Sequence, residues 1–251
     1  MRYLILDIEA VVDRSVWTPP EDDPDVFAPV FAWRPICVGL VLLKDSPAGV
    51  EVQSIGAVEE NGGGERELLE RFHAVVTRLG QCTIVSWNGR GYDLPVLMLR
   101  SLRYGMRAPW YYGGYKTRYR YSEEGHCDLM DAMGDYGAIR SLGLDGMARL
   151  IGLPGKPKGA DEVTGKNVAQ AYAAGRIAEI TRYCIADAVQ TAFLFLRWRL
   201  LQGAGPAEAT WYEVGARRLL EACDHDERLG ALVASVDRRV LLLERGEEAA
   251  A

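Results

Sequence analysis

The first sixty residues alternate between short apolar runs and polar turns. Residues 3–8 form a β-prone apolar run, Tyr-Leu-Ile-Leu-Asp-Ile, and similar runs occupy residues 36–43 and 50–58. Residues 44–49, between the latter two, include Asp, Ser, Pro and Gly, which is typical of a turn. The pattern therefore predicts three antiparallel strands, with a polar, proline-rich loop after the first.

Helical periodicity begins after the glycine-rich residues 61–64. Apolar residues then recur every three or four positions as far as Leu79, and Gly80 follows, which predicts a helix that ends there. The remaining expected elements are a strand at 83–87, a helix at 94–104, a tyrosine-rich loop at 108–125, an apolar segment near Cys127, helices at 141–152, 167–174 and 176–202, and a helical tail at 207–243.

This order of elements predicts an α/β fold in which a mixed sheet is flanked by helices. The run Gly-Ala-Gly-Pro at 203–206 is the best candidate for a linker. We expect a main domain over residues 1–205. Residues 206–251 are too few for a convincing independent domain, so we expect a helical extension that packs on the main body and frays at its end.

Composition narrows the class of protein. The 251 residues are 49% hydrophobic and 25% charged, which is typical of a globular protein and excludes a mainly disordered chain. The formal charge of −6 argues against a general duplex binder with a basic surface. Five cysteines without a C-x-x-C pair indicate a reducing compartment and argue against a structural zinc site. With no long apolar run and no signal peptide, we expect a cytoplasmic protein without a membrane partner.

Two acidic residues stand near the end of the first predicted strand. Asp7 and Glu9 are two positions apart, so both side chains project from the same face of the strand. Two like charges in an apolar run are costly unless a cation offsets them, and hard oxygen ligands suit Mg²⁺ or Mn²⁺. The alternative is a strand end whose acids simply face water.

Two further segments carry acids in suggestive positions. Asp93 follows a strand and a glycine-containing turn, at the edge of the sheet where open α/β folds bind ligands, although it could equally cap the following helix. Tyr183 and Asp187 lie four residues apart in a strongly helical segment and therefore share a face. Taken alone, that pair could equally stabilise a surface helix.

Together the three segments resemble the DEDD superfamily of 3′–5′ exonucleases. Asp-x-Glu at 7–9, Asn-x-x-x-Tyr-Asp at 88–93 and Tyr-x-x-x-Asp at 183–187 occur in the order of that family's motifs. The tyrosine is typical of the DEDDy branch. The likeness is greatest to stand-alone exonucleases related to the proofreading domain of family B DNA polymerases, and it covers roughly residues 3–200. The resemblance implies a ribonuclease-H-like fold with a mixed five-stranded sheet.

The resemblance also implies roles for individual residues. The four carboxylates Asp7, Glu9, Asp93 and Asp187 would hold two divalent cations, Mg²⁺ or Mn²⁺, which can activate water and stabilise the leaving 3′-oxygen. Tyr183 would orient the attacking water. The substrate-contacting positions implied are Ala10, Asn88 and Tyr92. Many members have Thr or Ser where this chain has Ala10, so a hydroxyl contact to the terminal nucleotide is expected to be missing.

Residues 100–121 combine cations and aromatic rings without any acid. That combination suits single-stranded nucleic acid, because phosphates meet positive charge and bases stack on rings. We expect Tyr115, Lys116, Arg118 and Arg120 to grip the strand, whereas the alternative is an ordered aromatic loop beside a solvated helix. A second small basic group, Lys156 and its neighbours before the last catalytic helix, is equally consistent with phosphate contacts and with a solvated loop.

The sequence therefore predicts a metal-dependent 3′–5′ exonuclease that acts on the 3′ end of single-stranded nucleic acid. DNA is favoured over RNA only by the likeness to polymerase proofreading domains, so a 3′-trimming ribonuclease stays open as an alternative. A non-catalytic nucleic-acid-binding module on the same fold is a second alternative, and a generic metal phosphatase is a third.

Overall fold

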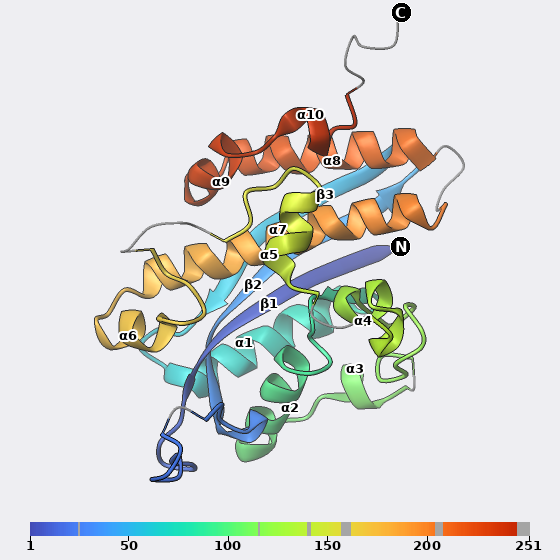
Figure 1. The fold of residues 1–251 in the computed structure, drawn as a ribbon. Coiled ribbons are helices and arrows are strands. Elements are labelled where there is room, and N and C mark those ends of the chain that lie inside the picture. The colour runs from blue at the N-terminus through green and yellow to red at the C-terminus, as the bar shows by residue number, and fades with distance from the viewer. Residues whose placement is uncertain (25, 115, 140–141, 157–161, 204–207, 245–251) are drawn as a thin grey trace, which may run out of the picture.

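One mixed five-stranded sheet organises the chain (Figure 1). The computed structural model describes residues 1–24, 26–114, 116–139, 142–156, 162–203 and 208–244. The strands are β1 (Arg2–Val12), β2 (Trp33–Ser46), β3 (Gly49–Glu59), β4 (Thr83–Ser86) and β5 (His126–Asp128), in the order β3-β2-β1-β4-β5. β1, β2 and β3 are antiparallel neighbours, whereas β4 and β5 run parallel to β1. The predicted fold class, a mixed sheet of five strands flanked by helices, is confirmed.

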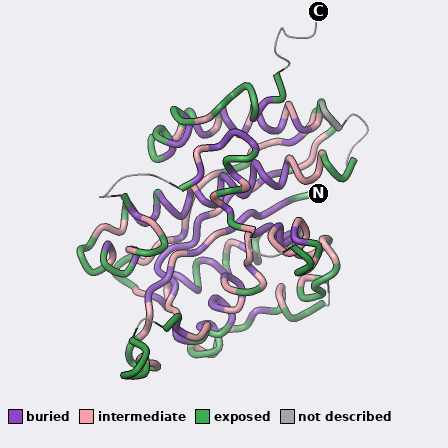
Figure 2. The backbone as a smooth tube through the Cα atoms, viewed as in Figure 1, coloured by how far each residue is buried: buried purple, intermediate pink, exposed green. Residues whose placement is uncertain are grey.

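Helices cover both faces of this sheet. They are α1 (Gly64–Leu79), α2 (Asp93–Arg103), α3 (Pro109–Tyr112), α4 (Leu129–Met133), α5 (Leu144–Leu150), α6 (Val168–Ala173), α7 (Ile177–Leu201), α8 (Glu208–Asp224), α9 (Gly230–Ala234) and α10 (Arg238–Leu241), with 3₁₀ turns η1 (Val30–Ala32), η2 (Asp135–Gly137) and η3 (Glu227–Leu229). α1 and α2 pack on one face, and α5, α7 and α8 pack on the other (Figure 1). Figure 2 shows the sheet buried between these two layers.

The alternation of side chains along β1 decides which layer each residue meets. Tyr3 and Ile5 belong to the core beneath α7, and the even-numbered Leu4, Leu6 and Ile8 belong to the core beneath α1 and α2. Successive residues of a strand point to opposite faces, so the odd-numbered acids that follow Ile5 continue on the α7 side.

One prediction of element bounds needs correction, and the predicted helical tail can be resolved into separate helices. Strands β2 and β3 continue through most of the predicted turn, since Ser46 pairs with Gly49 and only two residues connect them. The tail is helical but not continuous. Asp226 and Asp237 accept backbone N–H bonds from Arg228 at 3.0 Å and Val240 at 3.2 Å, so each starts a new short helix after α8.

The segments after residue 207 share the core of the α7 face. Tyr212 on α8 is fully buried and its hydroxyl donates to the Leu241 carbonyl, which ties α10 back to α8. Leu229 and Val233 are buried in the same cluster. Among the described residues, no helix combines the length and apolar character needed to cross a bilayer.

Candidate active site

Three carboxylates meet at the end of the sheet below α7. Asp7 and Glu9 come from β1, and Asp187 comes from the facing side of α7. One oxygen of each lies within 4.8 Å of the others. Asp187 is buried, whereas Asp7 and Glu9 are half-buried, so the cluster has one open side. Three of the four ligands predicted from the sequence are thus brought together.

The fourth predicted ligand, Asp93, adjoins this cluster. It is the first residue of α2 and is 4% exposed. Its Oδ1 accepts the backbone N–H of Ile8 at 3.0 Å, which fixes the carboxylate against β1. The N-cap position of α2 is Tyr92 and makes no side-chain cap bond, so the simple capping role considered for Asp93 is not what the fold uses.

Burial and mutual repulsion disfavour the ionised forms of all four acids. Burial raises the pKa of Asp93 from 3.8 to about 7 and that of Asp187 to about 6. Burial, together with the charges of neighbouring acids, raises the pKa values of Asp7 and Glu9 well above their ordinary range. A cation would remove this repulsion, and a set of carboxylate oxygens at this spacing fits Mg²⁺ or Mn²⁺.

The Tyr183 hydroxyl lies close enough to the Asp187 carboxylate for each group to shift the pKa of the other. The two residues are one helical turn apart on α7, and Tyr183 is 5% exposed. Burial and the neighbouring carboxylates raise the pKa of Tyr183 far above its ordinary value. Its hydroxyl therefore keeps its proton at any physiological pH.

The backbones of α7 and β2 lie unusually close together beside Asp7. Gly39 on β2 is the cross-strand partner of Asp7, and a Cβ at Gly39 would stand only 2.7 Å from the Cys184 carbonyl oxygen. The Gly39 N–H donates to Cys184 Sγ at 3.1 Å, and that sulfur lies 3.6 Å from Asp7 Oδ2. The sequence analysis missed Gly39 and Cys184. A glycine inside a long apolar strand was the one available signal.

The turn before Asp93 is held by Asp128. The Asp128 carboxylate accepts the backbone N–H groups of Asn88 at 2.9 Å and Arg90 at 2.8 Å, and also caps α4. Asn88 adopts a left-handed φ of 60°. His126 Nε2 lies 2.7 Å from Ser86 Oγ. His126 and Asp128 therefore hold the end of β4 and the turn after it in place.

Two predicted substrate-contacting positions flank the acids. Ala10 is buried and follows a break in the β1–β2 register after Glu9. Tyr92 packs against Trp33, with ring centroids 5.8 Å apart, and more loosely against the exposed Phe27 at 6.2 Å. Burial, then the charges of nearby acids, raises the pKa of Tyr92, so the ring lies at the edge of the acidic cluster.

The residues predicted to grip the strand, Tyr115, Lys116, Arg118 and Arg120, belong to a segment that we call the cationic loop. Its charges are only partly available to a ligand. Lys116, Arg118 and Arg120 are exposed, and Tyr115 lies outside the described residues. Lys116 pairs with Glu124, Arg120 pairs with Asp131 at 2.7 Å, and the Arg118 guanidinium lies 5.3 Å from the centre of the Tyr112 ring.

One cation of the basic segment 100–121 is structural. Arg100 is 2% exposed and donates to Glu65 at 2.5 and 2.7 Å and to Asp13 at 2.7 Å. These bonds join α2 to α1 and to the loop after β1. Arg100 therefore does not belong to a nucleic-acid surface.

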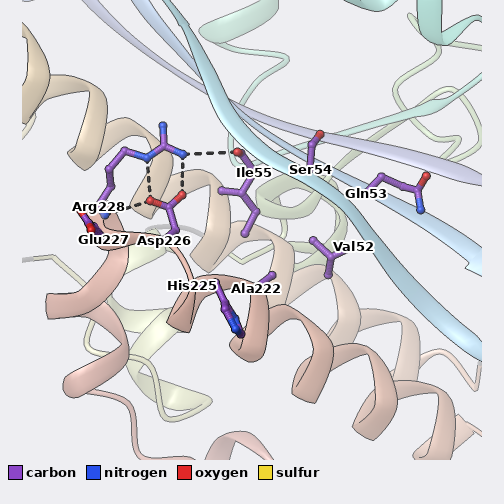
Figure 3. Close-up of a pocket in the computed structure, with 9 residues that line it drawn as sticks. All are labelled: Val52, Gln53, Ser54, Ile55, Ala222, His225, Asp226, Glu227 and Arg228. Carbon is purple, nitrogen blue, oxygen red and sulfur yellow. Dashed lines mark hydrogen bonds and ion pairs between the residues drawn. The ribbon is translucent and has the colours of Figure 1, made fainter.

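Two cavities differ in their relation to the acids. One of about 460 Å³ is lined by Tyr183 and Asp187, so it opens directly beside the cluster. The other, of about 540 Å³, lies between β3 and the end of α8 (Figure 3). It is the larger of the two, but none of the predicted site residues lines it, so its size does not make it the reaction site.

Comparison with known proteins identifies a family and a similar fold. A family model described as "Predicted 3′-5′ exonuclease related to the exonuclease domain of PolB" matches residues 25–229. The solved structure of the family B DNA polymerase from the hyperthermophilic archaeon Pyrobaculum calidifontis is similar with a TM-score of 0.51 and 16% identity, over 91% of this chain and 29% of the polymerase. At that identity the likeness concerns the fold, and this chain spans less than a third of the polymerase. No curated protein sequence matches significantly.

Proposed function

The chain belongs to the family of predicted 3′–5′ exonucleases related to the exonuclease domain of PolB, and from this we propose that it removes nucleotides from the 3′ end of single-stranded DNA with two divalent cations. The observation that carries the proposal is the convergence of Asp7, Glu9 and Asp187 within 4.8 Å, with Asp93 adjoining them. A phosphodiester would be repelled by such a cluster alone.

In this proposal Asp7, Glu9, Asp93 and Asp187 hold Mg²⁺ or Mn²⁺. When bound, the cations supply the positive charge that lets a phosphodiester approach and that stabilises the charge developing on the leaving 3′-oxygen. The β1 backbone fixes Asp93 through Ile8, and α7 fixes Asp187, so the carboxylates are oriented before substrate arrives.

Tyr183 is proposed to position the attacking water. Its raised pKa keeps the hydroxyl protonated, so it is not available as a general base, but beside Asp187 the hydroxyl can donate or accept one hydrogen bond in a fixed direction. A positioning role of this kind needs geometry rather than ionisation.

The strand is proposed to lie across the aromatic and cationic side chains around the cluster. Tyr92 offers a ring for base stacking beside Asn88 and Ala10, and Lys116, Arg118 and Arg120, with Tyr115 in the same loop, would meet phosphates. The buried, repelling acids weigh against the alternative of a binding module, because they cost stability and would hinder a phosphate-binding surface.

Digestion of 5′-labelled strands tests the proposal. We expect a ladder that shortens from the 3′ end with Mn²⁺ or Mg²⁺, that EDTA abolishes and that Asp187→Ala lacks. The rates on DNA and RNA of the same sequence decide between the DNA exonuclease and the 3′-trimming ribonuclease. Intact strands with every metal, together with retained binding, would overturn the enzyme and favour the binding module.

The cationic loop is tested by its effect on KM. Arg118→Ala combined with Arg120→Ala should raise KM for single strands without changing metal binding. Arg66→Ala on the exposed face of α1 is the matched control, because it removes an exposed arginine whose ion-pair partner is the exposed Glu70 of the same helix. An unchanged KM would remove the loop from the proposal.

A further inference from the structure

Each of the two acids on β1 has a buried thiol beside it. Cys184 on α7 is fully buried, and its Sγ lies 3.6 Å from Asp7 Oδ2. Cys37 on β2 is also fully buried and is the cross-strand partner of Glu9. Among the described residues, neither sulfur belongs to the set of possible ligand atoms within 4.8 Å of one another. The thiols therefore lie outside the candidate metal site and next to the carboxylates that form it.

Contacts on two sides fix the orientation of the Cys184 thiol. On the β2 side the Gly39 N–H donates to Sγ at 3.1 Å, so the sulfur is an acceptor there. On the β1 side Sγ lies 3.3 Å from the Asp7 carbonyl oxygen and 3.6 Å from Asp7 Oδ2, so the S–H points toward Asp7. The Cys37 thiol is also within hydrogen-bond reach of Cys184, but sulfur is a weak acceptor. Of these acceptors the carboxylate is the strongest, because it carries a charge.

A donor at Oδ2 limits the rotation of the Asp7 carboxylate. The terminal torsion of an aspartate is broad in the absence of such a contact. The neighbouring acids have donors of their own: Asp93 accepts a backbone N–H at 3.0 Å, and Asp187 accepts Gln190 Nε2 at 3.2 Å. For Asp7, which is only half-buried, the thiol supplies this contact from the buried side of the cluster.

We propose that Cys184 is a positioning residue whose thiol holds the Asp7 carboxylate in the orientation that Mg²⁺ requires, and that it thereby gives the acidic cluster a preference for Mg²⁺ over larger cations. The inference rests on the proposed function, in which Asp7 is one of the metal ligands. Cys184 acts through Asp7 and does not bind the cation itself, because its sulfur is not one of the ligand atoms of the cluster.

The preference follows from the different demands of the two cations. Mg²⁺ requires near-ideal octahedral geometry with oxygens at about 2.0–2.1 Å, whereas Ca²⁺ accepts irregular sets of oxygens at about 2.3–2.6 Å. A carboxylate that rotates freely still offers an oxygen to Ca²⁺, but fewer of its orientations complete an octahedron. Loss of the thiol should therefore weaken Mg²⁺ binding more than Ca²⁺ binding. A merely structural role for Cys184 would weaken both equally or neither.

Three variants separate the thiol from the packing of α7. Cys184→Ala removes the donor, and Cys184→Ser replaces it with a hydroxyl donor. Cys223→Ala is the matched control, because Cys223 is an equally buried cysteine on α8 whose acidic neighbours are Asp226 and Asp224. The probes are Mg²⁺ alone and Ca²⁺ alone, each titrated calorimetrically into the metal-free protein, and the melting temperature is recorded for every variant.

We expect Cys184→Ala to bind Mg²⁺ about tenfold or more weakly, which is the usual effect of removing a partner of a metal ligand. Its affinity for Ca²⁺ should fall by less than about threefold. Cys184→Ser should keep most of the affinity for Mg²⁺, and Cys223→Ala should bind both cations normally even where its melting temperature is lower. Cys184→Val fills the space without a donor and should repeat the selective loss, which keeps the inference testable if Cys184→Ala fails to fold.

Unchanged Mg²⁺ binding by Cys184→Ala would overturn the inference, as would equal losses of Mg²⁺ and Ca²⁺ affinity. A wild type that binds neither cation would overturn it together with the proposed function. Failure of the proposed function alone gives a different pattern. In that case the wild type digests no strand with any metal, whereas the selective loss of Mg²⁺ affinity in Cys184→Ala is still measured.

Discussion

Replacing Asp187 with asparagine is expected to stabilise the metal-free protein at about pH 8 while removing the nuclease activity. Asp187 is 5% exposed, and burial raises its pKa from 3.8 to about 6. Since each pH unit of that rise corresponds to about 1.4 kcal/mol, keeping the carboxylate ionised in the fold costs about 3 kcal/mol. Asparagine carries no charge and retains an oxygen for the Gln190 hydrogen bond. We expect the free energy of unfolding to rise by about 2–3 kcal/mol, or the melting temperature by roughly 4–12 °C.

The dependence on pH follows from proton linkage. The Asp187 carboxyl holds its proton more tightly in the folded chain than in the unfolded chain. The wild type therefore loses stability as the pH rises through the window from about 4 to about 6. The advantage of Asp187→Asn should grow across that window and level off above about pH 7. Under the proposed function Mn²⁺ should reverse the order, because a cation held by the native carboxylates would stabilise the folded wild type by mass action.

Scanning calorimetry in EDTA and in Mn²⁺, at several pH values, measures both effects. Glu221→Gln on the exposed face of α8 is the control, and it should shift stability by less than about 0.5 kcal/mol. A lower melting temperature for Asp187→Asn in EDTA at about pH 8, or an equal response of wild type and variant to Mn²⁺, would refute the reasoning.

Three further substitutions have defined outcomes. Gly39→Ala should push α7 away from β2 at Cys184 and destabilise the protein by about 1–3 kcal/mol, and an unchanged melting temperature would contradict the close approach. Arg100→Ala leaves two acids without their buried partner and should cost about 3–5 kcal/mol in urea unfolding, whereas the exposed Arg66→Ala should cost less than about 1 kcal/mol. Tyr183→Phe should lower kcat by about 10²-fold or more with Mn²⁺ stabilisation intact; a normal kcat would exclude the positioning role.

Periodic patterns predicted the elements that have long regular stretches. The strand β1 and the helices α1 and α7 are where the sequence placed them. β1 is apolar on both faces, α1 has one apolar face, and α7 has a long apolar stretch that is buried throughout residues 187–196. The tail is helical, as predicted, but it consists of several short helices after α8. Its apolar spacing continues past residue 224, but Asp226 and Asp237 accept backbone bonds that a continuous helix could not offer them.

The sequence was enough to locate the four acids, but it did not reveal the contacts that hold them in place. Asp7 and Glu9 reach α7 because a period of two continues the alternation of β1, so their face was predictable. The contacts that hold the cluster join distant segments: Gly39 with Cys184, and Ile8 with Asp93. Neither pair has a local signature, since a backbone N–H or a missing Cβ leaves no pattern in a window of residues. The same contacts keep charged groups together against their repulsion. Without metal, the cluster of four carboxylates lowers the stability of the fold. It is therefore held together by tertiary contacts and not by local sequence preferences.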